Sequence, residues 1–139
     1  MALNCVTWKD GAVWEKPTSA GTHILAALDR SASVCRVDLQ VTAGTNDHVM
    51  PDPHAQGLAF DVSVKGFDST MINLIRNYLN TTLGSEFTVL YEVPSKPDDV
   101  ALANIAYVNA GATAPHFHLQ LSKHLTVWPV PVQSPTVTV

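Results

Sequence analysis

The sequence predicts a single α+β domain in which two amphipathic helices alternate with the strands of one mixed sheet. The chain has 139 residues, which is enough for one domain with a hydrophobic core and too few for two comfortable ones. Two segments carry apolar residues at helical spacing, and several shorter ones alternate apolar and polar residues as half-buried strands do. We expect this domain to span residues 1–128, and the proline-, valine- and threonine-rich tail 129–139 to be extended or disordered.

The composition argues against several classes of partner. The formal net charge is −4 and the chain has no arginine cluster or basic stripe, so nucleic-acid phosphates are not an expected partner. No apolar stretch approaches the roughly 20 residues of a membrane span, and the first residues lack the basic and apolar regions of a secretory signal. We therefore expect a monomer that is synthesised in the cytoplasm and does not bind a membrane.

Two cysteines, Cys5 and Cys35, are present. Their spacing matches no metal-binding knuckle, and neither lies beside a histidine motif. Free thiols are the usual state of cytosolic cysteines, and a disulfide between the two remains the alternative in an oxidising compartment.

The first elements can be assigned from patterning. The first twenty or so residues are turn-rich, and we expect Trp8 and Trp14 to pack this segment onto the domain. Apolar residues at helical spacing predict an amphipathic helix over Ser19–Ser31. Alternation predicts a strand from Arg36 to Ala43, which ends at Gly44.

Another strand and a second helix follow. Residues Leu58–Val64 alternate again, so their apolar side chains should face the core while Asp61 lies on the opposite face. Asp68 or Ser69 can cap a helix that runs to about Thr82. We expect its buried face to consist of Met71, Leu74, Ile75, Tyr78 and Leu79.

The remaining third of the chain is less regular. Glu86–Tyr91 is a strand candidate. We interpret 93–114 as a substrate-facing loop with a short strand at Val100–Tyr107 and a turn at Gly111–Ala114. Alternation from His116 to Ser122 predicts the last strand.

Four metal-friendly side chains stand in two distant pairs, His54 with Asp61 and His116 with His118. Residues two apart in a strand project to one face, so His116 and His118 should emerge side by side. Gly57 allows the tight reversal that would return His54 over the strand of Asp61. A mixed sheet with that strand beside the last one would join His54, Asp61 and His118. Three such ligands with one open position are typical of catalytic zinc.

Each of these residues also has an ordinary explanation. A single histidine is more often a surface or core residue than a ligand, and we keep that interpretation for His23, His48 and His124. Asp61 is disfavoured in mid-strand and needs a partner there. Glu92 can be a solvated strand end, or a general base that takes the proton of a zinc-bound water.

A resemblance to a known family rests on features in a fixed order along the chain. They are a helix, a strand ending in Thr-Ala-Gly, His54 with Gly57, Ala59 and Asp61, a second helix, Tyr91-Glu92, and His116-Phe117-His118. This order resembles the zinc peptidases of the D-Ala-D-Ala carboxypeptidase and L-Ala-D-Glu endopeptidase group. It is similar to the amino-terminal signalling domain of hedgehog proteins and, more distantly, to lysostaphin-type enzymes. The resemblance spans about Ile24 to Ser122.

The resemblance implies an α+β fold with a small mixed, mainly antiparallel sheet and two or three helices. It also implies that His54, Asp61 and His118 are zinc ligands and that water takes the fourth place. Glu92 would be the general base and His116 would assist the water or the oxyanion. The family's usual substrates are the peptides of bacterial peptidoglycan.

Two departures from the family pattern bear on the substrate. Asp52 stands where members commonly have a serine, and Thr45 and Asn46 stand where they have an arginine that holds a substrate carboxylate. The missing arginine favours an endopeptidase over a carboxypeptidase. The segment between Glu92 and His116 is also longer than in the most similar members. Without a signal, action at the wall would need cell lysis or virion delivery, which agrees with a phage or viral origin.

Two other functions remain open from the sequence. One is a non-catalytic zinc module of hedgehog type, although retention of Glu92 and His116 favours an enzyme. The other is a rolling-circle-type endonuclease, because His116-Phe117-His118 also resembles the metal motif of those enzymes. Tyr78 would then be the nucleophile, but it lacks a neighbouring lysine, and the histidine at position 54 with Asp61 would have no role.

Overall fold

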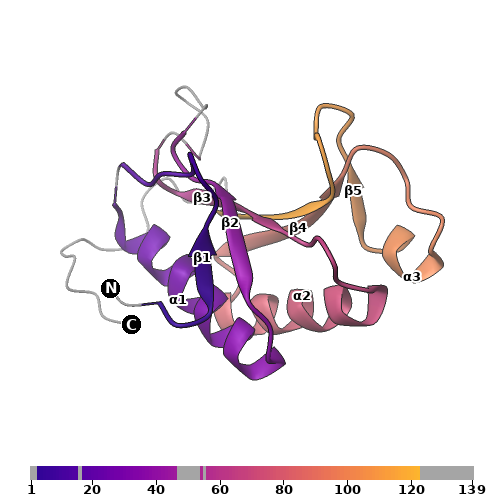
Figure 1. The fold of residues 1–139 in the computed structure, drawn as a ribbon, viewed down its shortest axis with the longest axis horizontal. Helices are drawn as coiled ribbons and strands as arrows, with labels where there is room; N and C mark the ends of the chain where they lie inside the picture. The colour runs from indigo at the N-terminus through magenta and orange to yellow at the C-terminus, as the bar shows by residue number, and fades with distance from the viewer. Residues whose placement is uncertain (1–2, 16, 47–53, 55, 123–139) are drawn as a thin grey trace.

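Six strands form one sheet whose spatial order differs from the order along the chain. The computed structural model describes residues 3–15, 17–46, 54 and 56–122. The strand order is β1-β2-β3-β6-β4-β5 (Figure 1). The strands are β1 (Val6–Trp8), β2 (Leu39–Ala43), β3 (Ala59–Ser63), β4 (Phe87–Val93), β5 (Ala106–Val108) and β6 (His116–Leu121).

The sheet is mixed, because its central and edge strands pair differently. The neighbours β2 and β3, β3 and β6, and β6 and β4 are antiparallel. The edge pairs β1 with β2 and β4 with β5 are parallel. Each parallel pair is joined by a crossover that contains a helix, as parallel pairing requires. The predicted α+β class with a mixed sheet is therefore confirmed, and the antiparallel pairing is confined to the four central strands.

Helix α1 covers Ser19–Cys35 and is longer than predicted. Thr18 caps its start by accepting a hydrogen bond from the N–H of Gly21. Its end is set by Arg36, which adopts a left-handed conformation with φ of 59°. The predicted strand start at Arg36 is therefore wrong, and β2 begins only at Leu39.

Helix α2 covers Ser69–Leu83, and Asp68 caps it as predicted by accepting from the N–H of Met71. Its buried face is rotated from the predicted one. Leu74 is 45% exposed, because it points away from the sheet while the stripe at i, i+3, i+7 and i+11 faces the core. That stripe consists of Ile72, Ile75, Leu79 and Leu83.

Two short elements were missed or misassigned. Asp99 accepts a hydrogen bond from the N–H of Leu102 and starts the one-turn helix α3 (Val100–Ala103). The predicted strand over 100–107 is thus wrong in its first half, and only β5 is extended there. The three residues of β1 are too few for an alternating pattern to be recognised.

The two faces of the sheet have different roles. Side chains facing α1 and α2 are fully buried, and among them are Phe60, Val62, Phe117 and Leu119. The opposite face carries polar side chains.

Trp8 and Trp14 both pack edge-on against the Phe60 ring, with centroids 6.0 and 5.6 Å away. The predicted anchoring of the N-terminal segment is confirmed.

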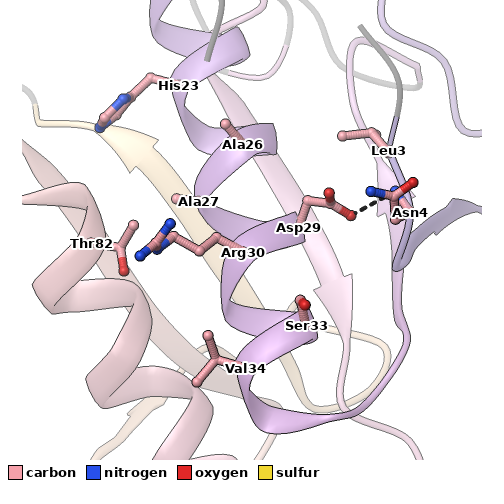
Figure 2. Close-up of a pocket in the computed structure, with 10 residues that line it drawn as sticks. All are labelled: Leu3, Asn4, His23, Ala26, Ala27, Asp29, Arg30, Ser33, Val34 and Thr82. Atoms are coloured by element: carbon pink, nitrogen blue, oxygen red, sulfur yellow. Dashed lines mark hydrogen bonds between the residues drawn. The ribbon is translucent and has the colours of Figure 1, made fainter.

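The helical layer carries a surface pocket of about 600 Å³ beside α1 (Figure 2). At its rim, the Asp29 carboxylate accepts hydrogen bonds from the backbone N–H groups of Asn4 and Cys5, 2.9 and 2.7 Å away. These bonds hold the N-terminal segment on α1. Both Cys5 and Cys35 are free thiols.

Among the described residues, no helix is long and apolar enough to cross a membrane. The predicted tail 129–139 lies outside the described part of the chain, as do His48, Asp52 and His124.

Candidate metal centre

The register of β3 and β6 brings the two distant sequence motifs together. Asp61 lies directly opposite His118, and Ser63 lies opposite His116. Directly paired residues of antiparallel strands project from the same face, so these side chains are neighbours. The expected adjacency of the two strands is confirmed.

His54 reaches the same place through a turn that ends at Gly57. The N–H of Gly57 donates to the carbonyl of His54 at 3.0 Å, and Gly57 has φ of 76°. This left-handed conformation favours glycine, as the sequence predicted. The Gly57 carbonyl accepts from Thr18 Oγ1 at 2.9 Å and from Trp14 Nε1 at 3.4 Å. The start of α1 therefore fixes the turn, and His54 is buried.

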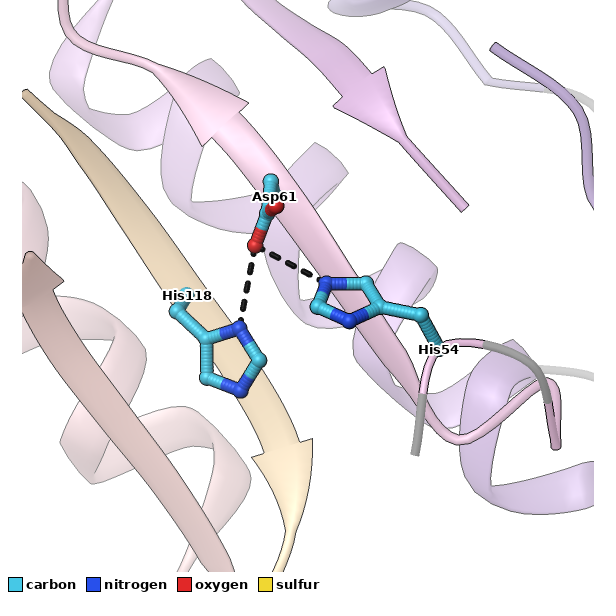
Figure 3. A group of neighbouring side chains, drawn as sticks. All are labelled: His54, Asp61 and His118. Atoms are coloured by element: carbon cyan, nitrogen blue, oxygen red, sulfur yellow. Dashed lines mark hydrogen bonds and ion pairs between the residues drawn. The ribbon is translucent and has the colours of Figure 1, made fainter. Parts of the chain in front are cut away.

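Three ligand-type atoms converge on the polar face of the sheet (Figure 3). Nε2 of His54 lies 2.9 Å from Oδ1 of Asp61, and Nδ1 of His118 lies 3.0 Å from the same oxygen. The three ligand atoms all lie within 4.8 Å of one another, so the group could hold a metal ion.

Gln120 determines which nitrogen of His118 faces the group. Nε2 of Gln120 donates to the carbonyl of Leu121, so its Oε1 must be the atom that faces His118. That oxygen lies 2.7 Å from Nε2 of His118. An amide oxygen only accepts, and Nε2 of His118 therefore carries a proton. In the neutral ring the lone pair then lies on Nδ1, toward Asp61.

The pKa values of Asp61 and His118 are shifted because their side chains lie so close together. Burial alone would raise the pKa of Asp61, but hydrogen bonds with His118 and His54 and the charges of His54 and His116 hold it well below its usual range. Burial would lower the pKa of His118, and its hydrogen bonds with Asp61 and Gln120, together with the charges of Asp61 and Glu92, raise it instead. The metal-free site thus favours an ion pair between Asp61 and His118.

The donor set suits a cation such as zinc. With His118 neutral, an imidazole lone pair and a carboxylate oxygen face each other at 3.0 Å, which is unfavourable unless a proton or a metal ion lies between them. Two imidazole nitrogens and one carboxylate oxygen are ligands that zinc accepts in catalytic sites, and Gln120 supplies the outer hydrogen bond typical of a ligating histidine.

Glu92 and His116 adjoin this group from the neighbouring strand pair. They lie opposite each other in the register of β4 and β6. Nδ1 of His116 donates to the carbonyl of Ala114 at 2.8 Å. Its Nε2 lies 2.8 Å from Oε1 of Glu92 and 3.7 Å from Oδ1 of Asp61. The short distance to Glu92 lacks hydrogen-bond geometry, so Nε2 is a buried polar atom without a hydrogen-bond partner among the described residues.

A surface pocket of about 700 Å³ runs past the site at the end of β3. Asp61 and His116 line it, together with Lys9, Thr42 and Lys65. Its volume falls within the range of ligand-binding pockets in proteins.

The five residues singled out from the sequence therefore lie together, and two others were missed. Gln120 could have been found, since it follows His118 by two positions in a strand and shares its face. Asn109, which donates to Glu92, lies in the irregular segment 93–114, where no periodicity gives a signal. His23 lies on α1 in the helical layer, where its ring packs against Phe87.

Thr45 and Asn46 hold the N-terminal segment through hydrogen bonds to its backbone. Thr45 Oγ1 donates to the carbonyl of Val13 and accepts from the N–H of Glu15. Asn46 Oδ1 accepts from the N–H groups of Val13 and Gly44. Both residues tie the loop after β2 to the N-terminal segment.

Comparison of the chain with family models, with curated proteins and with solved structures gives no match.

Proposed function

We propose that this protein is a zinc-dependent peptidase that hydrolyses peptide bonds in peptidoglycan stem peptides. One observation carries the proposal. His54, Asp61 and His118 offer ligand atoms within 4.8 Å of one another, and Glu92 and His116 stand beside them on the same face of the sheet. A three-ligand site next to a carboxylate and an imidazole has the components of metal-assisted hydrolysis.

Each side chain has a distinct task in this proposal. When bound to His54, Asp61 and His118, zinc would polarise the scissile carbonyl and lower the pKa of a water molecule to about 7. Glu92 takes the proton from the attacking water and later delivers it to the leaving amine. His116 keeps its Nδ1 proton on Ala114, so its Nε2 is available to donate to the developing oxyanion when protonated.

The substrate class rests on the order of motifs that resembles the peptidoglycan peptidases. We favour endopeptidase action of the L-Ala-D-Glu type, because Thr45 and Asn46 are committed to backbone contacts and provide no cation for a terminal carboxylate. The pocket beside Asp61 and His116 supports binding of a peptide that extends past the scissile bond.

Two alternatives have less support. A non-catalytic zinc module would have no use for Glu92 and His116, yet their side chains are each only 15% exposed and lie 2.8 Å apart at their closest atoms. A rolling-circle endonuclease would need Tyr78 beside the histidines. Tyr78 lies in α2, which packs on the face of the sheet opposite to the histidines.

The proposal is tested by separating metal binding from turnover. His54→Ala and His118→Ala should lose zinc and activity together, because each removes a ligand. Glu92→Ala should keep zinc and slow turnover by roughly a hundredfold or more. Zinc content is measured by elemental analysis, and products from defined muropeptides by mass spectrometry. A fully active Glu92→Ala protein would refute the role of Glu92, and activity that survives a strong chelator would refute the zinc mechanism.

Defined substrates also distinguish the enzyme from the binding module. The zinc-loaded protein should release new amines from L-Ala-D-Glu-containing stem peptides. A protein that holds one zinc per chain but releases none from sacculi or stem peptides would instead be the non-catalytic module.

A further inference from the structure

In the segment between β4 and β6, the side chain of Asn109 contacts Glu92 and is hydrogen-bonded within its own turn. Asn109 follows β5. Its N–H donates to the carbonyl of Val93 at 2.8 Å, and its carbonyl accepts from the N–H of Ala112 at 2.9 Å. Its side-chain Oδ1 accepts from the N–H of Gly111 at 2.9 Å. Three hydrogen bonds thus fix the backbone and the amide of Asn109.

These bonds also settle which end of the amide faces Glu92. Because Oδ1 is bound to the N–H of Gly111, the other end of the amide, Nδ2, faces Glu92 and donates to its Oε2 at 3.1 Å. The parallel pairing of β4 and β5, with Glu92 opposite Tyr107, brings Asn109 to this position.

The contact divides the carboxylate of Glu92 into two unlike oxygens. Oε2 is tethered by Asn109, while Oε1 lies 2.8 Å from Nε2 of His116. With Oε2 bound to Asn109, Oε1 is the oxygen that lies beside His116. Further along the same segment, the Ala114 carbonyl accepts from Nδ1 of His116. One stretch of chain, 109–114, therefore holds both Glu92 and His116.

We propose that Asn109 is the positioning residue of Glu92, and that the segment 93–114 serves to deliver it. This inference rests on the proposed function for its kinetic consequences. A donated N–H stabilises the charged carboxylate, which is the form that accepts a proton. The segment expected from the sequence to face the substrate thus has a second task, the orientation of the general base.

Two substitutions separate positioning from a purely structural role. Asn109→Asp keeps an oxygen for the N–H of Gly111, so the turn is preserved, but it replaces the donor facing Glu92 with a carboxylate oxygen. Asn109→Ala removes both contacts. Asn104→Asp is the matched control, because it adds the same charge in the same segment at the end of α3.

The kinetic expectation follows from the lost donor. Asn109→Ala should lower kcat by roughly tenfold, and Asn109→Asp should lower it at least as much. The loss should appear in kcat rather than in KM, because the contact orients Glu92 and does not bind the substrate. KM and zinc content should stay close to wild type, as should every property of Asn104→Asp.

Distinct outcomes count against the inference and against the proposed function. If Asn109→Asp has wild-type kcat while Asn109→Ala is impaired, Asn109 only stabilises the turn and the inference is wrong. If the wild-type protein cleaves no stem peptide, the proposed function is wrong. In that case, crystal structures of the wild type and of Asn109→Ala still decide the inference. The Glu92 carboxylate should lie beside His116 in the wild type and turn away from it in Asn109→Ala, and an unchanged position would overturn the contact.

Discussion

At the scale of single residues, one carboxylate oxygen organises the site. Oδ1 of Asp61 lies within 3.0 Å of a nitrogen of both His54 and His118. Two neutral imidazoles can bind this oxygen only by donating N–H hydrogen bonds to it. A metal ion, in contrast, can be bound by the oxygen and by both nitrogens at once. The direction of the His118 ring is then set by Gln120, a residue that binds no metal itself.

This geometry predicts the effect of removing the Gln120 acceptor. Gln120→Leu should weaken zinc affinity by roughly ten- to a hundredfold, because Nε2 of His118 loses the partner that keeps the lone pair on Nδ1. Gln120→Glu retains an acceptor and should bind zinc within a fewfold of wild type. Competition with a chromophoric chelator measures both. Gln40→Leu, on the exposed side of β2, is the control, and equal affinities for Gln120→Leu and wild type would disprove the role.

The shifted pKa values predict how the stability of the metal-free protein depends on pH. Because folding raises the pKa of His118, the protonated ring stabilises the fold. This stabilisation is complete below the pKa of the unfolded state, about 6.5, and is lost as the pH rises through the pKa of the folded state. Because folding lowers the pKa of Asp61, the ionised carboxylate stabilises the fold. This stabilisation is present above about pH 3.9, the pKa of the unfolded state, and is lost as the pH falls through the pKa of the folded state. Their combined contribution is therefore largest between about pH 4 and pH 6.5.

Urea unfolding of the metal-free protein at several pH values tests this window. Asp61→Asn removes the charge that both shifts depend on, so the difference in unfolding free energy between wild type and Asp61→Asn should be largest inside the window and shrink on either side. A difference that does not vary with pH would contradict the expectation.

At the scale of elements, the turn that carries His54 depends on one backbone conformation. Gly57 has φ of 76°, and its carbonyl is held by Thr18 and Trp14. The beginning of α1 and a remote tryptophan thus fix the position of His54, a candidate metal ligand that belongs to neither a helix nor a strand.

Substitution of this glycine should affect both stability and metal binding. Gly57→Ala places a side chain in the left-handed region, at a cost of about 1–2 kcal/mol, and should weaken zinc affinity because the turn relaxes and displaces His54. Gly11→Ala is the matched control, since Gly11 has φ of 89° and open space around its Cα. It should lose a similar amount of stability in thermal unfolding and retain full zinc affinity. Equal zinc affinity in both variants would contradict the expected coupling.

Local patterning predicted the long elements well and the short ones poorly. The cap of α2 at Asp68 depends only on neighbours in the chain, and so does the alternation that places Asp61 opposite the apolar side chains of its strand and His116 beside His118. The structure confirms these predictions. The extension of α1 to Cys35 depends on Arg36 taking a left-handed conformation, which is uncommon for a residue other than glycine. The position of α3 depends on Asp99 acting as a cap in a segment without periodicity.

At the scale of the whole molecule, the site is a consequence of strand order. The last strand, β6, inserts between β3 and β4, so residues near positions 61, 92 and 118 meet on one face. Both long helices cover the other face (Figure 1). The core is therefore complete without the site, and the polar face can carry chemistry.

Because zinc would connect β3, β6 and the turn at His54, its removal should destabilise the whole fold. Zinc at a hundred times its dissociation constant adds about 2.7 kcal/mol, which corresponds to a rise in Tm on the order of 10 °C for a domain of this size. Calorimetry with and without zinc measures the rise. It should be absent in His118→Ala, and a wild-type Tm that does not respond to zinc would contradict a metal site built from these residues.

The sequence by itself determined which residues share a face, because strand alternation and helix caps are local properties. It thereby predicted that His116 and His118 project from the same face of their strand, and it predicted the side of β3 on which Asp61 lies. Tertiary structure decided the rest: the insertion of β6 between β3 and β4, the parallel edge strands, and the contacts of Gln120 and Asn109 with His118 and Glu92. These depend on which strands become neighbours, and strand order is set by packing of the complete core rather than by any single segment.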